Sequence, residues 1–303
     1  MSNAPDRRGP GTVTTHEAAL RRLELIVRLK LDGLLHGDYL GLVPGSGSEL
    51  AGGRVYSPGD DVRRMDWNLT ARSQEPHIRD TIADRELETW IVVDASASLD
   101  FGTVGCEKRD LATAAAAAFG FLTAQAGNRL GALVFDSAGT GILPPRGGRA
   151  ATLALLHRIE ARPRAVTGEA DLAAALTRVA GLARRRGLVV VVSDLLDTSD
   201  WRVPLRLLAA RHDVVVAQVT DRREAALPAV GVVTFVDPES GRRVEAQTSD
   251  PRLRARFATA AAAQRETLAQ AVRAAGAAHL VLATDRDWVL DIVKFAAARR
   301  RRR

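Results

Sequence analysis

The stretch LVVVVSD, residues 188–194, places five consecutive apolar residues before a serine and an aspartate. A strand with one face in water alternates apolar and polar residues, whereas a continuous Val/Leu run is typical of a strand buried on both faces. Similar runs recur at WIVVD (90–94), LGALVF (130–135), DVVVAQVTD (213–221) and HLVLATD (279–285). We therefore expect a mostly parallel sheet.

Helical segments separate these strands. They are expected at residues 107–125, 151–161, 171–185, 201–211, 252–275 and 287–298. Strands that alternate with helices predict a doubly wound α/β domain, here over residues 89–298. VGVVTFVD (230–237) and RRVEAQT (242–248) predict a hairpin that supplies an antiparallel edge, and the segment around Pro144 and Pro145 is expected to be a loop.

The ends of the chain differ from this core. Residues 1–13 are polar and rich in Gly and Pro, which predicts a disordered leader. Residues 14–88 are expected to hold an N-terminal helix, opened by a capping box at Thr14 and Glu17, and then a small β-rich module. Residues 299–303 are all arginine and are expected to form a solvated basic tail.

Composition limits the possible functions. The net charge of +7 owes five charges to the terminal arginines, and no basic stripe is interleaved with aromatic residues, so specific nucleic-acid binding is not expected. One cysteine excludes a disulfide framework and a cysteine-cluster metal site. No signal peptide or transmembrane run is visible, and we expect a cytoplasmic protein.

The strand ends carry the candidate chemistry. Asp94, Ser96 and Ser98 follow one strand and Asp194 follows another, and ligands of doubly wound sheets bind outside the carboxyl ends of the strands. Such an oxygen-only set could hold Mg²⁺ or Mn²⁺, cap a helix or simply make a turn. Asp221 and Asp285 also end strands, where capping of the next helix explains them adequately.

The pattern Asp94-x-Ser96-x-Ser98 resembles the metal-ion-dependent adhesion site of von Willebrand factor A-type domains. This resemblance implies that Ser96 and Ser98 ligate a cation directly, while Asp94 and Asp194 act partly through water. The second loop departs from the family pattern, because Ala170 stands where a threonine is expected. Thr167 or Asp171 could supply an oxygen instead, and Thr167 is included in the predicted metal site.

A longer resemblance covers most of the chain from residue 37 to 295. PGDDVRRMDW (58–67), VVDASASLDFGT (92–103) with Lys108, LGALVFDSAG (130–139) and GAAHLVLATDRDWVLDIVKF (276–295) resemble the bacterial family called domain of unknown function 58. It implies partnership with a MoxR-type AAA+ ATPase in chaperone-like maturation or assembly. The charges of residues 58–67 are interpreted as ion pairs that fix the small module.

Three functional hypotheses follow. The first is a non-enzymatic adaptor in which a bound divalent metal receives an acidic side chain of a protein partner. The second is a Mg²⁺-dependent hydrolase or phosphatase, with Asp100 and Asp197 near the site in sequence. The third is a protein-interaction module that works without metal, which Ala170 favours. We expect the first.

Overall fold

The computed structural model describes residues 51–57, 62, 65–73, 75–80, 87–164 and 168–301. The described chain begins with β1 (Ala51–Val55), α2 (Trp67–Ser73) and β2 (His77–Asp80), and β1 pairs with β2 in an antiparallel sheet. Two antiparallel strands and a short helix therefore precede the main domain. The leader, the helix expected from Thr14, and four charged residues of the 58–67 segment lie outside the described residues.

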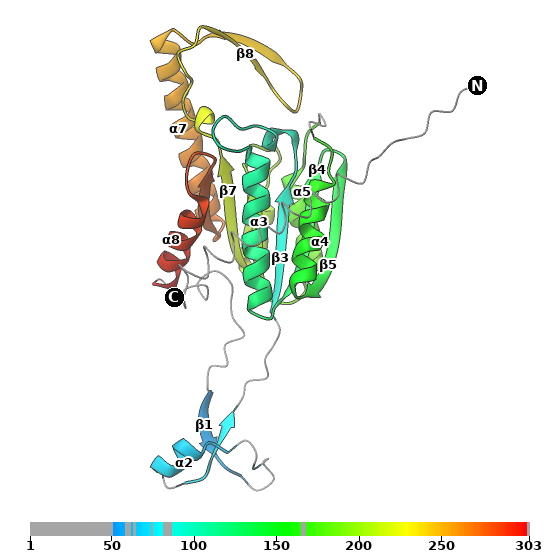
Figure 1. Ribbon diagram of the computed structural model, residues 1–303, viewed down its shortest axis with the longest axis vertical. Coiled ribbons are helices and arrows are strands. Elements are labelled where there is room, and N and C mark those ends of the chain that lie inside the picture. The colour runs from blue at the N-terminus through cyan, green and yellow to red at the C-terminus, as the bar shows by residue number, and fades with distance from the viewer. Residues whose placement is uncertain are drawn as a thin grey trace, which may run out of the picture.

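A six-stranded sheet forms the centre of the main domain (Figure 1). Its strands are β3 (Glu88–Asp94), β4 (Arg129–Asp136), β5 (Gly139–Gly147), β6 (Leu188–Ser193), β7 (Asp213–Thr220) and β10 (Ala278–Ala283). Their order is β10-β7-β6-β3-β4-β5, and every neighbouring pair is parallel except β4–β5. The strand order reverses between β3 and β6, as in other doubly wound sheets. The predicted fold class is confirmed.

Helices cover both faces of this sheet, which explains the uninterrupted apolar strands. One core joins the sheet to α3 (Lys108–Gln125), α4 (Arg149–Glu160) and α8 (Trp288–Arg300). The other core joins the opposite face to α5 (Leu172–Leu182), α6 (Arg202–Arg211) and α7 (Pro251–Ala274). Figure 1 shows α3 in front of the sheet, running alongside β3. Alanines 115–118 are fully buried on α3, and their small side chains allow the helix to lie close to the strands.

The antiparallel edge is not the one expected from the sequence. The segment with Pro144 and Pro145 is not a loop but lies in the edge strand β5, where the missing N–H groups of the two prolines can be tolerated. The hairpin is present as β8 (Val232–Val236) and β9 (Arg243–Gln247), but these strands form a separate two-stranded sheet. Most of their side chains are exposed, including the apolar Val232, Phe235, Val236 and Val244, so the hairpin is not part of the buried core.

The C-terminal arginines are only partly a tail. Helix α8 continues to Arg300, and the Arg299 guanidinium forms an ion pair with Asp213 at the start of β7. Because Asp213 belongs to β7, this ion pair fixes the end of α8 to the sheet. Within the described ranges, each helix is too short or too polar to cross a lipid bilayer.

Candidate functional site

Four of the five predicted metal-site residues meet where the strand order reverses. Asp94 ends β3, Ser96 and Ser98 lie in the turn after it, and Asp194 follows the neighbouring strand β6. The Ser98 hydroxyl donates to Asp194 Oδ2 (2.7 Å), and the Ser96 and Ser98 oxygens are 3.0 Å apart. Since Ser98 gives its one hydrogen to Asp194, Ser96 donates to Ser98. All four side chains are buried. The fifth, Thr167, lies outside the described residues.

Asp94 serves as an internal anchor of this cluster. Its Oδ1 accepts a hydrogen bond from the Ser96 backbone N–H (2.9 Å), and its Oδ2 accepts one from the Ser193 hydroxyl (2.8 Å). Burial, and then the negative charge of Asp194, raise the pKa of the Asp94 carboxyl from 3.8 to about 7, although these hydrogen bonds oppose the rise. Both carboxylate oxygens are thus engaged in fixing the turn to β6.

The first residue of α3, Lys108, also reaches the cluster. This contact was not predicted from the sequence. The Lys108 side chain is 1% exposed, and its Nζ donates to Asp194 Oδ2 at 2.8 Å, the oxygen that also accepts from Ser98. It forms a second ion pair with Glu224, which is 28% exposed and follows β7. Burial alone would lower the pKa of Lys108, but the Asp194 and Glu224 carboxylates outweigh it and raise the pKa. The ammonium is therefore charged at neutral pH.

The backbone of Gly102 lies close to the segment just before Lys108, and this close approach positions the start of α3. The Lys108 backbone N–H donates to the Phe101 carbonyl (2.8 Å), which folds the loop back onto the start of α3. A Cβ on Gly102 would lie 2.4 Å from the Cys106 carbonyl oxygen, too close for any side chain there. The Lys108 ammonium also lies 6.0 Å from the centre of the Phe101 ring, within the range of a cation–π contact. The signal in the sequence that could have revealed this residue is its place at the start of the helix after β3, which begins at the same edge of the sheet.

The second loop offers no clear replacement for the missing threonine. Ala170 is buried in the apolar core beneath α5. Asp171 is the N-cap of α5 and accepts from the Ala174 N–H (2.8 Å), so its carboxylate has a structural role. In the described part of the chain, no group of three or more His, Cys, Asp or Glu side chains is arranged to hold a metal ion.

The acidic residues considered for hydrolysis are also committed to other contacts. Asp100 pairs with Arg109, whose Nη2 lies 3.0 Å from Asp100 Oδ2. Asp197 accepts from the backbone N–H groups of Leu172 (3.1 Å) and Ser199 (2.6 Å). Both carboxylates therefore organise loops, and neither resembles a free general base.

Asp221 is the centre of a second buried cluster next to the first. It accepts from the Thr103 N–H and hydroxyl (3.0 and 2.7 Å), the Thr284 hydroxyl (2.6 Å) and the Arg223 N–H (2.8 Å). Glu224, the partner of Lys108, accepts in turn from the Asp221 N–H (2.9 Å). Polar contacts thus join the loops that follow β3, β6, β7 and β10.

The capping role expected of the two strand-end aspartates holds for one of them. Asp221 caps the short 3-10 helix Arg222–Glu224. The prediction was wrong for Asp285, which is exposed, because Asp287 caps α8 by accepting from the Val289 and Leu290 N–H groups. Four residues, 284–287, separate the end of β10 from the start of α8, so the cap falls two residues later than the sequence pattern suggested.

Three large apolar side chains are exposed in the loops that carry this polar cluster. Phe101, Val104 and Leu196 are about 40% exposed (41%, 39% and 40%), and they lie in the loops after β3 and β6. The Leu196 N–H donates to Asp194 Oδ1 (3.0 Å). Leu195, which lies between Asp194 and Leu196 in the sequence, has a positive φ of 61°, a strained conformation for a branched residue. The backbone is held in this conformation where Leu196 turns outward.

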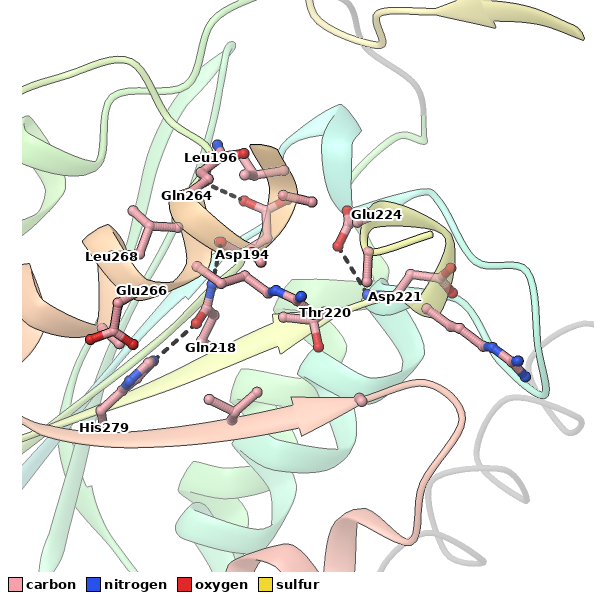
Figure 2. A pocket seen from close by; sticks show the side chains of 18 of the residues that line it. Asp194, Leu196, Gln218, Thr220, Asp221, Glu224, Gln264, Glu266, Leu268 and His279 are labelled. Carbon is pink, nitrogen blue, oxygen red and sulfur yellow. Dashed lines mark hydrogen bonds between the residues drawn. The ribbon is translucent and has the colours of Figure 1, made fainter. Parts of the chain in front are cut away.

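A cavity of about 710 Å³ opens beside the cluster (Figure 2). It extends from Asp194 and Glu224 along β7 and β10 beneath α7. Figure 2 shows a line of hydrogen bonds at its base, in which His279 contacts the Gln218 amide oxygen (3.0 Å) and the Gln218 amide nitrogen donates to the Asp194 carbonyl (3.3 Å). The volume is in the range of ligand-binding pockets, and charged and apolar side chains both line it.

Solved structures with a similar fold come from distant proteins. An aerotolerance-related membrane protein of Bacteroides fragilis is 15% identical with a TM-score of 0.48, covering 72% of this chain and 100% of that one. BatB of Bacteroides thetaiotaomicron is 13% identical with a TM-score of 0.47, covering 71% of this chain and 99% of that one. These likenesses are of the fold.

Relatives by sequence are much closer. Uncharacterized protein Rv1480 of Mycobacterium tuberculosis and uncharacterized protein Mb1516 of Mycobacterium bovis are each 55% identical over 285 residues, which cover 94% of this chain and 90% of each relative. The family model described as protein of unknown function DUF58 matches residues 52–267. Because that model covers more than half of the residues, this chain belongs to the DUF58 family.

Proposed function

We propose that this protein is a non-catalytic adaptor that binds another protein at the carboxyl end of its sheet. The observation that carries the proposal is the exposed apolar group of Phe101, Val104 and Leu196 around the buried Asp194–Lys108 pair. Apolar side chains gathered over a rigid polar base are typical of protein-binding surfaces. We call these three residues the apolar rim.

The contacts beneath the rim suit a preorganised surface. Phe101 lies over the Lys108 ammonium, and the Leu196 N–H is held by Asp194, so two rim residues are fixed to the same buried ion pair. Binding at such a surface orders few additional groups, which lowers the entropic cost of association. The strained φ of Leu195 further supports a functional role for this turn, because strain of this kind gathers at binding sites.

The partner proposed is a MoxR-type AAA+ ATPase, and the role is chaperone-like maturation or assembly of other proteins. Membership of the DUF58 family supports this choice through the resemblance described above. The chain has no P-loop sequence, in keeping with ATP hydrolysis by the partner. In the alternative form of the proposal, Mg²⁺ or Mn²⁺ at Ser96, Ser98 and Asp194 receives an acidic side chain of the partner.

Binding of a purified MoxR-type ATPase from the same genome, measured by calorimetry, tests the proposal. Leu196→Ser should weaken binding by about tenfold or more, the loss expected for a contact at the centre of an interface. Leu290→Ser is the matched control, since Leu290 on α8 is equally exposed (41%) and lies outside the rim. Equal binding by both variants, or no binding by the wild type, contradicts the proposal.

A chelator separates the two forms of the proposal. If EDTA leaves the affinity unchanged, recognition does not depend on metal, and if EDTA abolishes it, the ion takes part. The hydrolase hypothesis receives no support from the contacts of Asp100 and Asp197, which bind Arg109 and backbone N–H groups respectively.

A further inference from the structure

We propose that the Lys108 ammonium is the resident cation of this site and occupies the electrostatic role that a divalent metal has in related adhesion sites. The starting observation is its burial between two carboxylates, with Nζ 2.8 Å from Asp194 Oδ2 and paired to Glu224 on the other side. Lysine side chains are almost never fully buried unless they are paired. The Asp194 and Glu224 carboxylates therefore account for the burial of Lys108 at this site.

Three of the roughly four acceptor positions of the Asp194 carboxylate are occupied, including both on Oδ2. Oδ1 accepts from the Leu196 N–H at 3.0 Å, while Oδ2 accepts from both Ser98 Oγ and Lys108 Nζ. A divalent ion bound to Oδ2 would lie within about 5 Å of the ammonium, because metal–oxygen bonds are about 2 Å long. Two cations that close together in a buried site repel each other strongly. The residues present therefore do not fit a metal while Lys108 holds this position.

The serine geometry, by contrast, has not been lost. The 3.0 Å between the Ser96 and Ser98 oxygens is close to the separation of neighbouring ligands around an octahedral Mg²⁺, and each hydroxyl oxygen keeps a free lone pair. Ala170 leaves the second loop without the threonine oxygen, but it is the Lys108 ammonium on Asp194 Oδ2 that excludes a divalent ion. Removal of the lysine alone is expected to make the site able to accept a metal.

The inference also changes the chemistry expected of a partner. Lys108 is 1% exposed, and its ammonium already contacts Asp194 and Glu224, so an acidic side chain from outside cannot reach it. Recognition would then depend on the apolar rim rather than on a carboxylate–metal bond. The inference itself concerns the isolated chain and does not rest on the proposed function.

Metal titration of purified wild type, Lys108→Met and Lys294→Met tests the inference. Melting temperature is measured in EDTA and in saturating MnCl₂, and Mn²⁺ binding is measured directly by electron paramagnetic resonance. Wild type should bind no Mn²⁺ and show no shift. Lys108→Met should melt at a lower temperature in EDTA and recover by about 5 °C or more in Mn²⁺. Lys294, an exposed lysine on α8, provides the control and should behave as wild type.

Two further results make the test decisive. Ser98→Ala added to Lys108→Met should abolish the Mn²⁺ response, because it removes a ligand from the opened site. Stoichiometric Mn²⁺ binding by the wild type overturns the inference, and this measurement needs no variant to fold. A folded Lys108→Met protein that ignores Mn²⁺ also overturns it. Because no partner is present, these outcomes are independent of whether the ATPase binds.

Discussion

Asp221→Asn is predicted to destabilise the protein substantially although the two side chains have the same shape. Asp221 is 2% exposed and accepts four hydrogen bonds, two on each oxygen. Each oxygen receives one from a hydroxyl and one from a backbone N–H: Oδ1 from Thr103 Oγ1 and Arg223 N, Oδ2 from Thr284 Oγ1 and Thr103 N. In either orientation of an asparagine side chain, its NH₂ group must therefore face one hydroxyl and one backbone N–H.

The expected loss follows from that geometry. The hydroxyl can rotate and accept from the new NH₂ group, but the backbone N–H cannot, so one buried donor loses its acceptor at a cost of about 1–3 kcal/mol. The remaining bonds also lose the strength that a charged acceptor gives. We expect a total near 3 kcal/mol, which lowers the melting temperature of a domain this size by about 6–12 °C.

The loss should depend on pH. Burial alone would raise the pKa of Asp221, but hydrogen bonds from Thr284, Thr103 and the Arg223 N–H outweigh it and hold the pKa below 3.8. A carboxyl with a lowered folded-state pKa contributes stability that is present above 3.8 and lost as pH falls through the folded value. The difference between wild type and Asp221→Asn should therefore be constant near neutral pH and shrink below pH 3.8.

Urea and thermal unfolding at several pH values measure this difference. Asp285→Asn is the matched control, because Asp285 also follows a strand but is exposed, and its change should stay within about 0.5 kcal/mol. The reasoning is refuted if both variants lose the same small amount. It is also refuted if the Asp221→Asn difference persists undiminished at the acid end, since an ionised carboxylate could then not be its source.

Other parts of the site give three more predictions, each read by urea unfolding. Lys108→Met should cost about 3–5 kcal/mol because it leaves Asp194 charged and buried, and Asp194→Asn in the same chain should restore much of the loss. Gly102→Ala should cost about 1–3 kcal/mol through its clash with backbone atoms, whereas Gly181→Ala on α5, with open space around it, should stabilise by about 0.5–1 kcal/mol. Arg299→Ala should destabilise the end of α8 by about 1 kcal/mol or more, a result that a solvated tail would not give.

Much of the fold could be predicted because strands that are buried on both faces of a sheet consist of continuous apolar residues. Runs such as residues 188–192 contain no polar residue to face water, so helices must cover both sides. The edge strand has no such continuous apolar run. Most residues of β5 are exposed or half-buried, and two of them, Pro144 and Pro145, are typical of turns. The segment is a strand because it pairs with β4.

The convergence of Asp94, Ser96, Ser98 and Asp194 could also be predicted, since it needs only the rule that parallel strands end at one edge. The rule says nothing about long side chains that arrive from helices. Lys108 stands fourteen residues after Asp94 in a different element, and its head reaches Asp194 only because the Gly102 loop returns to the start of α3.

The charge of the site therefore depends on a contact between elements and not on the local pattern that suggested a metal. Asp-x-Ser-x-Ser supplies the same oxygens whether or not a lysine lies beside Asp194. In this chain the Lys108 ammonium pairs with carboxylates that follow β6 and β7, and under the inference above it takes the place of an ion from solution. A site built this way would keep the apolar rim in one arrangement at every metal concentration. Its affinity for a partner would accordingly be set by Phe101, Val104 and Leu196, and would not rise or fall with Mg²⁺.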